Sequence, residues 1–388
     1  MLRMMQYLSE LIHAQLEYKK PGNIPEGILL EELIQIAHKS HMDYLILGAL
    51  LKTDLTDEEK SRIRPFVLKS TLNTFAQICC LREIEENFEE REIYHLVLKG
   101  SVLKQLFPAP EMREMSDIDV MIYDDNLERV KKVVLEMGFT LLKSVKHHDI
   151  YVKAPCLVLE VHNALYDKNV DKNQYEYFQS KKKIVAKDGK RYTMQFGKED
   201  FYVYLIAHMA KHFYETGCGI RNVLDVYWYR HIYESTWDES IIRDELQKCG
   251  LTVFEKRIHI LSQVWLGGQI PDPYSKALFG YMLDCGIYGK GENGVWGQFA
   301  KQNHNSSKNY KTYAKRWYYF PPLSYMENEY SWLKKFPFMI IVAWVVRAGH
   351  GLFSKGGREK RNMLLNLKSE DVCTIYDIYK GMQLDFKK

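Results

Sequence analysis

The sequence predicts an α+β protein in which a small mixed β-sheet lies between helical N- and C-terminal regions. Two observations predict this class. Apolar residues recur at spacings of three and four through most of residues 1–93 and again after residue 195, which is typical of helices. Residues 94–195 instead contain short apolar runs bounded by turn residues, which is typical of strands. We therefore expect a helical region at 1–93, a sheet-containing core at 94–195 and a helical region at 196–388.

The N-terminal region is expected to fold as a set of helices. Apolar residues between Leu29 and Ile36 recur at helical spacing and would lie on one face. Thr56 can cap a helix, and Glu59, three positions later, can close a capping box with it. A long helix is predicted from about 66 to 93, where the pattern changes.

The core region is predicted to alternate short strands with helices. The expected strands are His95–Leu98, Asp117–Ile122, Ile150–Val152 and Leu157–His162. A turn at Lys99–Ser101 leads from the first strand into a helix at Val102–Phe107. An amphipathic helix at Asn126–Met137 is expected to end at Gly138.

The C-terminal region is again helical by its periodicity. Helices are predicted at 199–214, 220–232, 239–266, 273–285, 328–350 and 369–384. A glycine-rich loop is expected at 286–294, and a long connection at 303–325.

Composition and charge exclude several classes of protein. The 388 residues are 46% hydrophobic and 27% charged, which is ordinary for a globular chain and argues against disorder. The net charge of +4 comes from 54 basic and 50 acidic residues, so bulk binding of nucleic acid is not expected. Short basic clusters at 181–183 and 358–361 are interpreted as solvated surface. Seven cysteines without a C-x-x-C pair favour reduced thiols and a cytoplasmic location.

No segment is long and apolar enough to predict a membrane span. Charged or polar residues at Glu10, His13 and Glu17 interrupt the N-terminal segment, which is interpreted as an amphipathic helix and not as a secretion signal. The longest apolar run, Phe336–Val346, has eleven residues, whereas a spanning helix needs about 20. A buried helix is the favoured interpretation of this run, and a peripheral membrane contact stays open.

Three elements of the core carry residues suited to chemistry on phosphates. Gly100 and Ser101 lie at the turn from a strand into a helix, and Asp117 and Asp119 follow after a gap of fifteen residues. Glu160 lies on a later strand between apolar neighbours. Each signal alone is weak, but their order, spacing and strand context together are specific.

The residue types explain the chemistry. Residues two apart on a strand point to the same face, so Asp117 and Asp119 are expected to project together. Two neighbouring carboxylates repel each other unless a cation lies between them or one takes a proton. Their oxygens suit Mg²⁺ or Mn²⁺, and Glu160 could complete a two-metal site. Gly100 allows the backbone to approach a phosphate, which the Ser101 hydroxyl and the N–H groups of the helix start could bind.

This pattern resembles the DNA polymerase beta-type nucleotidyltransferase superfamily, and within it a bacterial family of uncharacterised nucleotidyltransferases. The resembling stretches are Leu98–Ser101, Phe107–Pro110, Arg113–Asp119, Gly138–Phe139 and Leu159–His162, with looser likeness at His208–His212, Arg221–Asp225 and Phe336–Arg347. The resemblance covers most of the chain from about residue 70. It implies a nucleotidyltransferase core at 94–195 and a C-terminal helical region that binds substrate.

The resemblance also implies roles for individual residues. Asp117, Asp119 and Glu160 would be the catalytic and metal-binding set, although many members of the superfamily have Asp in the third position. Gly100 and Ser101 would hold the triphosphate of an NTP, such as ATP. Lys99 and Arg113 flank the motif and could neutralise phosphate charge, or they could be surface charges or form a salt bridge to Glu111 or Glu114. Glu160 could also serve as the base.

Several polar residues keep open interpretations. His162 could touch the metal or the substrate, or it could be a structural histidine, which is the favoured interpretation. His208 and His212 have the i, i+4 spacing of a zinc protease site, but Met209 replaces the glutamate that such a site needs, so a structural or substrate-pocket role is favoured. Arg221 and Asp225 could form an ion pair on a helix surface or face the cleft.

Other enzyme classes lack their motifs. The string at Gly289–Gly294 matches G-x-G-x-x-G but follows a predicted helix and not a strand, and no P-loop or G-x-S-x-G motif occurs. The expected activity is transfer of a nucleoside monophosphate from an NTP to an acceptor with release of pyrophosphate. A small-molecule acceptor is favoured. The alternatives are a toxin-type enzyme acting on tRNA or protein, and a non-catalytic nucleotide- or partner-binding module on the same scaffold.

Overall fold

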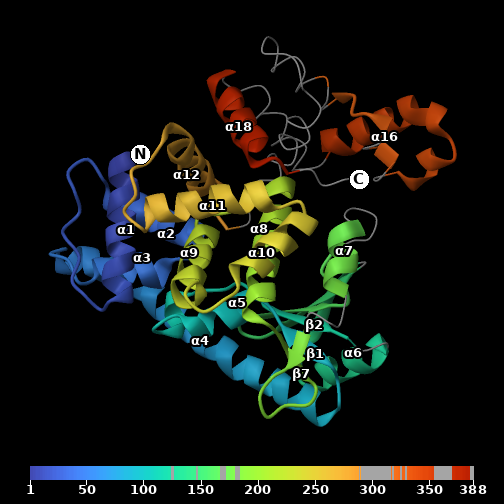
Figure 1. The fold of residues 1–388 in the computed structure, drawn as a ribbon, viewed down its shortest axis with the longest axis horizontal. Coiled ribbons are helices and arrows are strands. Elements are labelled where there is room, and N and C mark those ends of the chain that lie inside the picture. Colours follow the sequence, from blue (N-terminus) through green and yellow to red (C-terminus); the bar gives the residue numbers. More distant parts are fainter. Residues whose placement is uncertain are drawn as a thin grey trace. The chain divides into compact units, whose positions relative to one another are not determined.

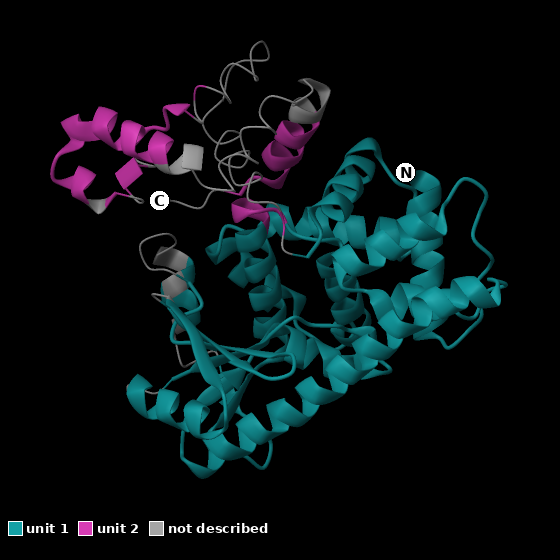
Figure 2. Ribbon diagram, turned by 180° about the vertical axis from the view of Figure 1, so that it is seen from behind, with its two compact units in different colours: residues 1–212, 218–288, 385–388 teal, residues 213–217, 289–384 magenta. Residues whose placement is uncertain are grey.

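A computed structural model describes most of the chain. The described residues are 1–123, 126–145, 147–166, 172–179, 184–287, 289, 316, 319–323, 326–327, 330–353 and 369–384. The basic clusters at 181–183 and 358–361 lie outside them, as do most of the expected loop at 286–294 and connection at 303–325. The described residues form two compact units (Figure 2). Unit 1 lies within residues 1–212 and 218–288, and unit 2 lies within residues 213–217 and 289–384. The predicted division at residues 93 and 195 stays a prediction.

Unit 1 is built on a seven-stranded mixed sheet, which confirms the predicted α+β class. The strands are β1 (His95–Val97), β2 (Ile118–Ile122), β3 (Thr140–Val145), β4 (His148–Lys153), β5 (Leu157–His162), β6 (Ile184–Ala186) and β7 (Thr193–Phe196). Their order is β3-β4-β5-β2-β1-β7-β6, and the pairs β2–β5 and β1–β7 are parallel. The four expected strands are confirmed. The sequence did not predict β3, β6 and β7, two of which are edge strands, where polar residues weaken the apolar alternation.

Helices in the N-terminal region follow the prediction closely. They are α1 (Leu2–Leu16), α2 (Leu30–Ser40), α3 (Asp43–Leu50) and α4 (Asp57–Glu90). The capping box between Thr56 and Glu59 is present. The long helix therefore begins at Asp57 and not near residue 66, because it continues through Pro65. An internal proline costs about 3 kcal/mol, which the buried face of the helix must offset.

One face of the sheet is covered by α4 and α6 (Figure 1). From β2, Ile118, Val120 and Ile122 enter a core that also contains Ile84 and Phe88 of α4. Because side chains alternate along a strand, Asp119 must face the opposite side of the sheet. The apolar core thus decides which face of the sheet carries the polar residues.

The remaining helices include most of those expected after residue 195. The helices after β1 are α5 (Lys99–Leu103), α6 (Leu127–Glu136), α7 (Lys172–Gln179), α8 (Lys198–Glu215), α9 (Arg221–Tyr233), α10 (Glu239–Lys248), α11 (Thr252–Trp265), α12 (Pro273–Cys285), α16 (Ile340–Phe353) and α18 (Ser369–Met382). The helix expected over 239–266 is two helices, because Gly250 takes a left-handed conformation with φ +68 after α10. The helix expected from residue 328 begins only at Ile340, after short 3-10 turns.

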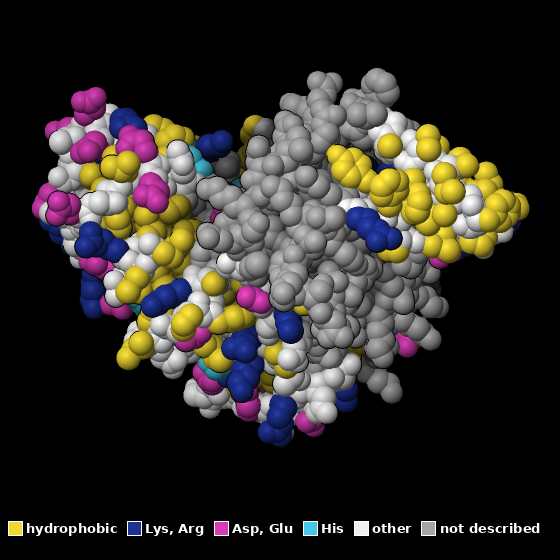
Figure 3. Space-filling view, turned by 90° about the horizontal axis from the view of Figure 1, so that it is seen from above, with side chains coloured by type: hydrophobic (Ala, Val, Ile, Leu, Met, Phe, Trp, Pro, Cys, Tyr) yellow, Lys and Arg dark blue, Asp and Glu magenta, His cyan; other side chains and the backbone are white. Residues whose placement is uncertain are grey.

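The apolar run at Phe336–Val346 is exposed, so its expected burial is wrong. Phe338 is 76% exposed, Ile341 65% and Val345 67%. Apolar side chains gather on the surface of the segment that holds α16 (Figure 3). Within unit 2 this run contributes Ala343 to the buried cluster, since a single helix can bury only the stripe that faces its partners. No helix in the described part of the chain is long and apolar enough to cross a membrane.

The end of α4 is tied to β7 by the carboxylate of Glu89. It accepts hydrogen bonds from the backbone N–H groups of Arg191, Tyr192 and Thr193 and from the Thr193 hydroxyl, at 2.6–3.2 Å. Burial raises the pKa of Glu89, but these hydrogen bonds outweigh it and hold the pKa at about 2. The ionised carboxylate is therefore the form that stabilises the fold.

Replacing Glu89 by glutamine is expected to lower the free energy of unfolding at neutral pH by about 1–3 kcal/mol, the range for hydrogen bonds to a charged group. Since the pKa is depressed in the folded state, this contribution is present above the unfolded value of 4.5 and is lost as the pH falls towards about 2. Urea unfolding from pH 7 to pH 2 measures it. The exposed neighbour Glu90→Gln is the control and should change little. Equal stability of the two variants at pH 7 would contradict the prediction.

Candidate active site

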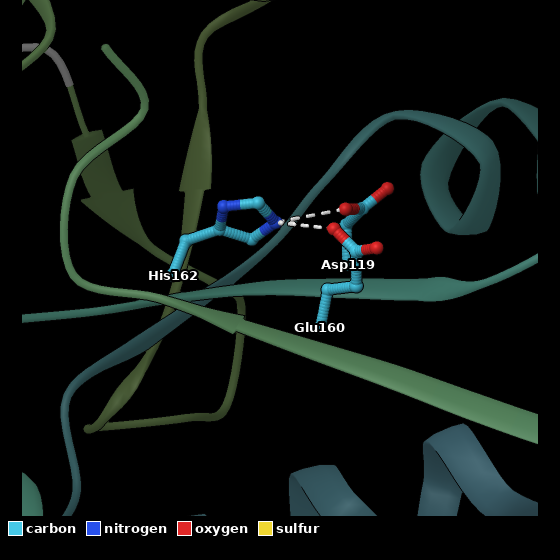
Figure 4. A group of neighbouring side chains, drawn as sticks. All are labelled: Asp119, Glu160 and His162. Atoms are coloured by element: carbon cyan, nitrogen blue, oxygen red, sulfur yellow. Dashed lines mark hydrogen bonds and ion pairs between the residues drawn. The ribbon is translucent and has the colours of Figure 1, made fainter. Parts of the chain in front are cut away.

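The pairing of β2 with β5 brings the predicted acidic residues together. The strands are parallel, and Asp119 is the register partner of Glu160, while Met121 is the partner of His162. Neighbouring partners in a sheet point to the same face, so Asp119, Glu160 and His162 all project away from the α4 side. One ligating atom from each of these three residues lies within 4.8 Å of the others (Figure 4).

Asp119 is the most buried member of this group, with 4% of its surface exposed. Its Oδ1 lies 2.9 Å from Nε2 of His162, and its Oδ2 lies 3.5 Å from Nζ of Lys99. Burial alone raises the pKa of Asp119, but Lys99 and His162 more than offset this and hold it well below the usual range. Asp119 is therefore the firmly ionised carboxylate of the site.

The negative charge of Asp119 acts on the other two carboxylates, Asp117 and Glu160. Asp117 lies directly before β2, and burial together with the charge of Asp119 raises its pKa to about 6. Burial and Asp119 also raise the pKa of Glu160. The oxygen atoms of Asp119 and Glu160 converge, and these two carboxylates form a donor set that fits a divalent cation. Asp117 is not part of the three-residue group that converges within 4.8 Å.

The predicted phosphate turn lies beside the acids. Helix α5 begins at Lys99, with one residue between it and the end of β1, and Lys99 has a positive φ of 34°. A Cβ on Gly100 would lie 3.1 Å from the Cβ of Met115, so the close approach of these segments favours glycine. The Ser101 hydroxyl is buried and donates to Sδ of Met115 at 3.6 Å. Lys99 thus reaches the acidic group, whereas phosphate binding by Gly100 and Ser101 stays a prediction.

Arg113 is a buried ion-pair partner of α9. Its Nε and one terminal nitrogen donate to the two carboxylate oxygens of Asp225 at 2.5 and 2.8 Å, and the other terminal nitrogen bonds the Glu114 carbonyl. Arg221 is also buried and donates to the Glu114 carbonyl at 2.8 Å. Burial and the nearby Arg113 lower the pKa of Arg221 to about 9. Of the two open interpretations, the surface ion pair between Arg221 and Asp225 does not hold, because both residues are buried and Arg113 binds the carboxylate.

His208 and His212 form a pair on α8. Their Nε2 atoms are 2.9 Å apart, so one imidazole donates to the other. Burial and the charge of Lys99 lower the pKa of His208 well below its usual range and that of His212 to about 3, so both rings are neutral. Neither joins the group of potential metal ligands found among the described residues. The arrangement favours the structural or pocket role over zinc.

Three residues near the acids were not predicted from the sequence. His148 on β4 places Nε2 3.9 Å from Oε2 of Glu160. Tyr204 of α8 is buried, its hydroxyl has no hydrogen-bond partner among the described residues, and burial together with the charge of Asp119 raises its pKa. Lys211 of α8 lowers the pKa of Glu160. Tyr204, His208 and Lys211 are spaced by four and three, so helical periodicity could have placed them on one face.

A polar cavity of about 430 Å³ lies beside the residues that directly precede Asp117. It is lined by residues of α2–α4 and by the motif loop: His38, His41, Asp43, Phe66, Lys69, Ser70, Asn73, Thr74, Gln77, Glu114, Met115 and Ser116, together with Cys156. Ser116 directly precedes Asp117, and its hydroxyl lies 3.2 Å from Nδ1 of His41. The N-terminal helices therefore build a chamber beside the segment that leads into Asp117, and none of Asp117, Asp119 and Glu160 is among its lining residues.

Comparison with known proteins identifies one family. The family described as "Uncharacterised nucleotidyltransferase" matches residues 26–267. The chain is similar to the antibiotic-resistance factor ANT(2'')-Ia in solution (10% identity, TM-score 0.26, 50% of this chain and 91% of that one). It is also similar to ANT(2'')-Ia in complex with adenylyl-2''-tobramycin (11%, 0.26, 50% and 98%) and to an antigenic nucleotidyltransferase-like protein from Paracoccidioides brasiliensis (16%, 0.28, 50% and 92%). No curated protein matches.

Proposed function

Because the chain belongs to the family of uncharacterised nucleotidyltransferases, we propose that it moves a nucleoside monophosphate from an NTP to a hydroxyl group of a small molecule. The observation that carries the proposal is the convergence of Asp119 and Glu160 across parallel strands, with Asp117 two residues before Asp119 and Lys99 beside it. This arrangement supplies carboxylates for a cation and a positive side chain for a phosphate within one small region.

Asp117, Asp119 and Glu160 are the proposed holders of Mg²⁺ or Mn²⁺. Their oxygens are the ligand type that these ions prefer, and the raised pKa values of Asp117 and Glu160 show that nearby positive side chains do not fully offset burial and the charge of Asp119. A divalent ion bound there supplies positive charge that stabilises the reacting phosphate oxygens. Lys99 and Lys211 provide further positive charge for the triphosphate, and Gly100 and Ser101 provide the helix start that follows β1.

The transfer step is a displacement at the α-phosphorus of the NTP. The acceptor hydroxyl oxygen forms a bond to this phosphorus, and the bond from the phosphorus to the oxygen that bridges the α- and β-phosphates breaks. Pyrophosphate leaves with that electron pair. The hydroxyl proton passes to a carboxylate, for which Glu160 is the candidate because its pKa is raised. Arg113 has a positioning role, since it anchors the motif loop to Asp225 of α9.

The polar cavity beside Ser116 is the proposed acceptor site. Its volume of about 430 Å³ lies in the range that holds a small molecule, about 300–1,000 Å³. Its lining offers amide, hydroxyl and imidazole groups together with Asp43 and Lys69. These groups suit a hydroxylated, hydrogen-bonding molecule better than an apolar one.

Release of pyrophosphate tests the function directly. Purified protein is incubated with each NTP, Mg²⁺ or Mn²⁺, and separate pools of hydroxylated small molecules, tRNA or protein. We expect release that depends on the small-molecule pool. Release that depends on tRNA or protein would replace the proposed acceptor, and NTP binding without release under every condition would favour the non-catalytic module.

Filling the cavity tests the acceptor site. Asn73→Trp is expected to raise the KM for the active small-molecule pool about tenfold or more, because the indole occupies the acceptor volume, while NTP affinity stays the same. Leu72→Trp is the matched control, since Leu72 is on the same helix and 59% exposed. Steady-state kinetics with the acceptor varied measures both. An unchanged KM in Asn73→Trp would place the acceptor elsewhere.

A further inference from the structure

We propose that Nε2 of His162 is a direct ligand of the ion held by Asp119 and Glu160. The site would then hold one nitrogen and several oxygen donors and select Mn²⁺ over Mg²⁺. This inference rests on the proposed function, because it concerns the ion used at the same site. It goes beyond the acidic motif, which by itself describes an all-oxygen site.

The strand register places the three donor atoms together. Glu160 and His162 are two residues apart on β5 and so share one face, and Asp119 is the partner of Glu160 on β2. Nε2 of His162 lies 2.9 Å from Oδ1 of Asp119 and 3.5 Å from Oε2 of Glu160. In Figure 4 this nitrogen faces both carboxylates, which come from the adjacent strand and from the same strand. A single ion can therefore meet all three donors without rearrangement of the backbone.

The imidazole of His162 is held in this orientation. Its ring centroid lies 5.0 Å from that of His148, with 34° between the ring planes, and His148 is its register partner on β4. Its side chain is 15% exposed. The ring of His162 therefore packs beside His148, and the pairing of β4 with β5 sets the positions of both residues. A proton on Nε2 fills the position between imidazole and carboxylate in the absence of metal, and a cation can take that position.

Donor chemistry decides which ion the site prefers. Imidazole nitrogen is a ligand of divalent transition metals, among which Mn²⁺ binds most weakly and also accepts oxygen ligands, whereas Mg²⁺ prefers oxygen ligands and retains several waters. A mixed site of one nitrogen and several oxygens therefore favours Mn²⁺ over Mg²⁺. The competing role for His162 is that of a charged partner that stabilises ionised Asp119 without touching the ion. That role predicts an all-oxygen site with no preference arising from His162.

Pulsed EPR of the full-length protein loaded with Mn²⁺ in the absence of NTP distinguishes the two roles. We expect ¹⁴N modulation from a coordinated imidazole in the wild type, its loss in His162→Gln and its retention in His148→Gln, which removes the neighbouring ring. Calorimetric titration should show Mn²⁺ affinity falling at least about tenfold in His162→Gln, with a smaller change for Mg²⁺. The wild-type spectrum decides the main point even if a variant folds poorly.

The outcomes separate this inference from the proposed function. Bound Mn²⁺ without ¹⁴N modulation overturns the inference and leaves a metal-dependent transferase in place. Modulation that disappears in His148→Gln and persists in His162→Gln also overturns it. Failure of the wild type to bind Mn²⁺ or Mg²⁺, with or without an NTP, overturns the metal-dependent function itself.

Discussion

Replacing Asp117 and Asp119 together by asparagine is expected to abolish NTP turnover while the protein stays folded. The change keeps the shape of both side chains but removes the two charges that would hold the cation. Loss of a catalytic ion removes several kcal/mol of transition-state stabilisation, and each ~1.4 kcal/mol is a tenfold change in rate. We therefore expect turnover to fall by about 10³-fold or more, measured as pyrophosphate release.

Two features of the site explain why the fold should survive this change. The charge of Asp119 contributes to the raised pKa values of Asp117 and Glu160, so its removal relieves repulsion, although it also removes a partner of Lys99 and His162. Circular dichroism and urea unfolding check the fold. Asp149→Asn is the matched control, because Asp149 is on β4, which pairs with β5 and not with β2, and it accepts a hydrogen bond from Tyr151 at 3.2 Å. Turnover by the double variant at the wild-type rate would remove the assignment of both aspartates.

Replacing Arg113 by methionine is expected to give the largest loss of stability, about 3–5 kcal/mol in the free energy of unfolding. The side chains of Arg113 and Asp225 are only 5% and 1% exposed, and two hydrogen bonds join them. Without Arg113, the carboxylate of Asp225 stays buried without its bidentate partner, which costs more than the ion pair itself contributes. Urea unfolding at pH 7 measures the change.

A double variant separates the loss of a partner from the loss of packing. Arg113→Met with Asp225→Leu removes both charges, so most of the stability should return. Arg62→Met is the control, because Arg62 pairs with Glu31 at the surface, where both side chains are about half exposed. We expect it to cost less than about 1 kcal/mol. If Arg113→Met changes only the KM for NTP and not stability, Arg113 binds phosphate, as the sequence motif alone suggested.

Local patterns were sufficient to predict the strands and the turn that build the site. The alternation of acidic and apolar residues at Asp117–Ile122 and at Leu157–His162 reports which side chains enter the apolar core, and the structure contains both strands. The glycine at position 100 marks the close approach to Met115. The capping box at Thr56 marks the start of α4, although the long helix was predicted only from about residue 66. These features depend on a few neighbouring residues, so the sequence alone contains them.

Contacts between distant segments were decided only by the tertiary structure. Periodicity shows that Glu160 and His162 share a face of one strand. Only the parallel register of β5 with β2 places them beside Asp119, which lies 41 residues before Glu160 in the sequence. In the same way, helical spacing would allow Asp225 to pair with Arg221. In the structure it pairs with Arg113, which lies 112 positions earlier in the chain. The exposure of Phe338 and Ile341 was also unpredictable, because an apolar side chain is buried only if another surface meets it. Sequence periodicity reports the face on which a residue lies, whereas its partner is set by how the strands and helices pack together.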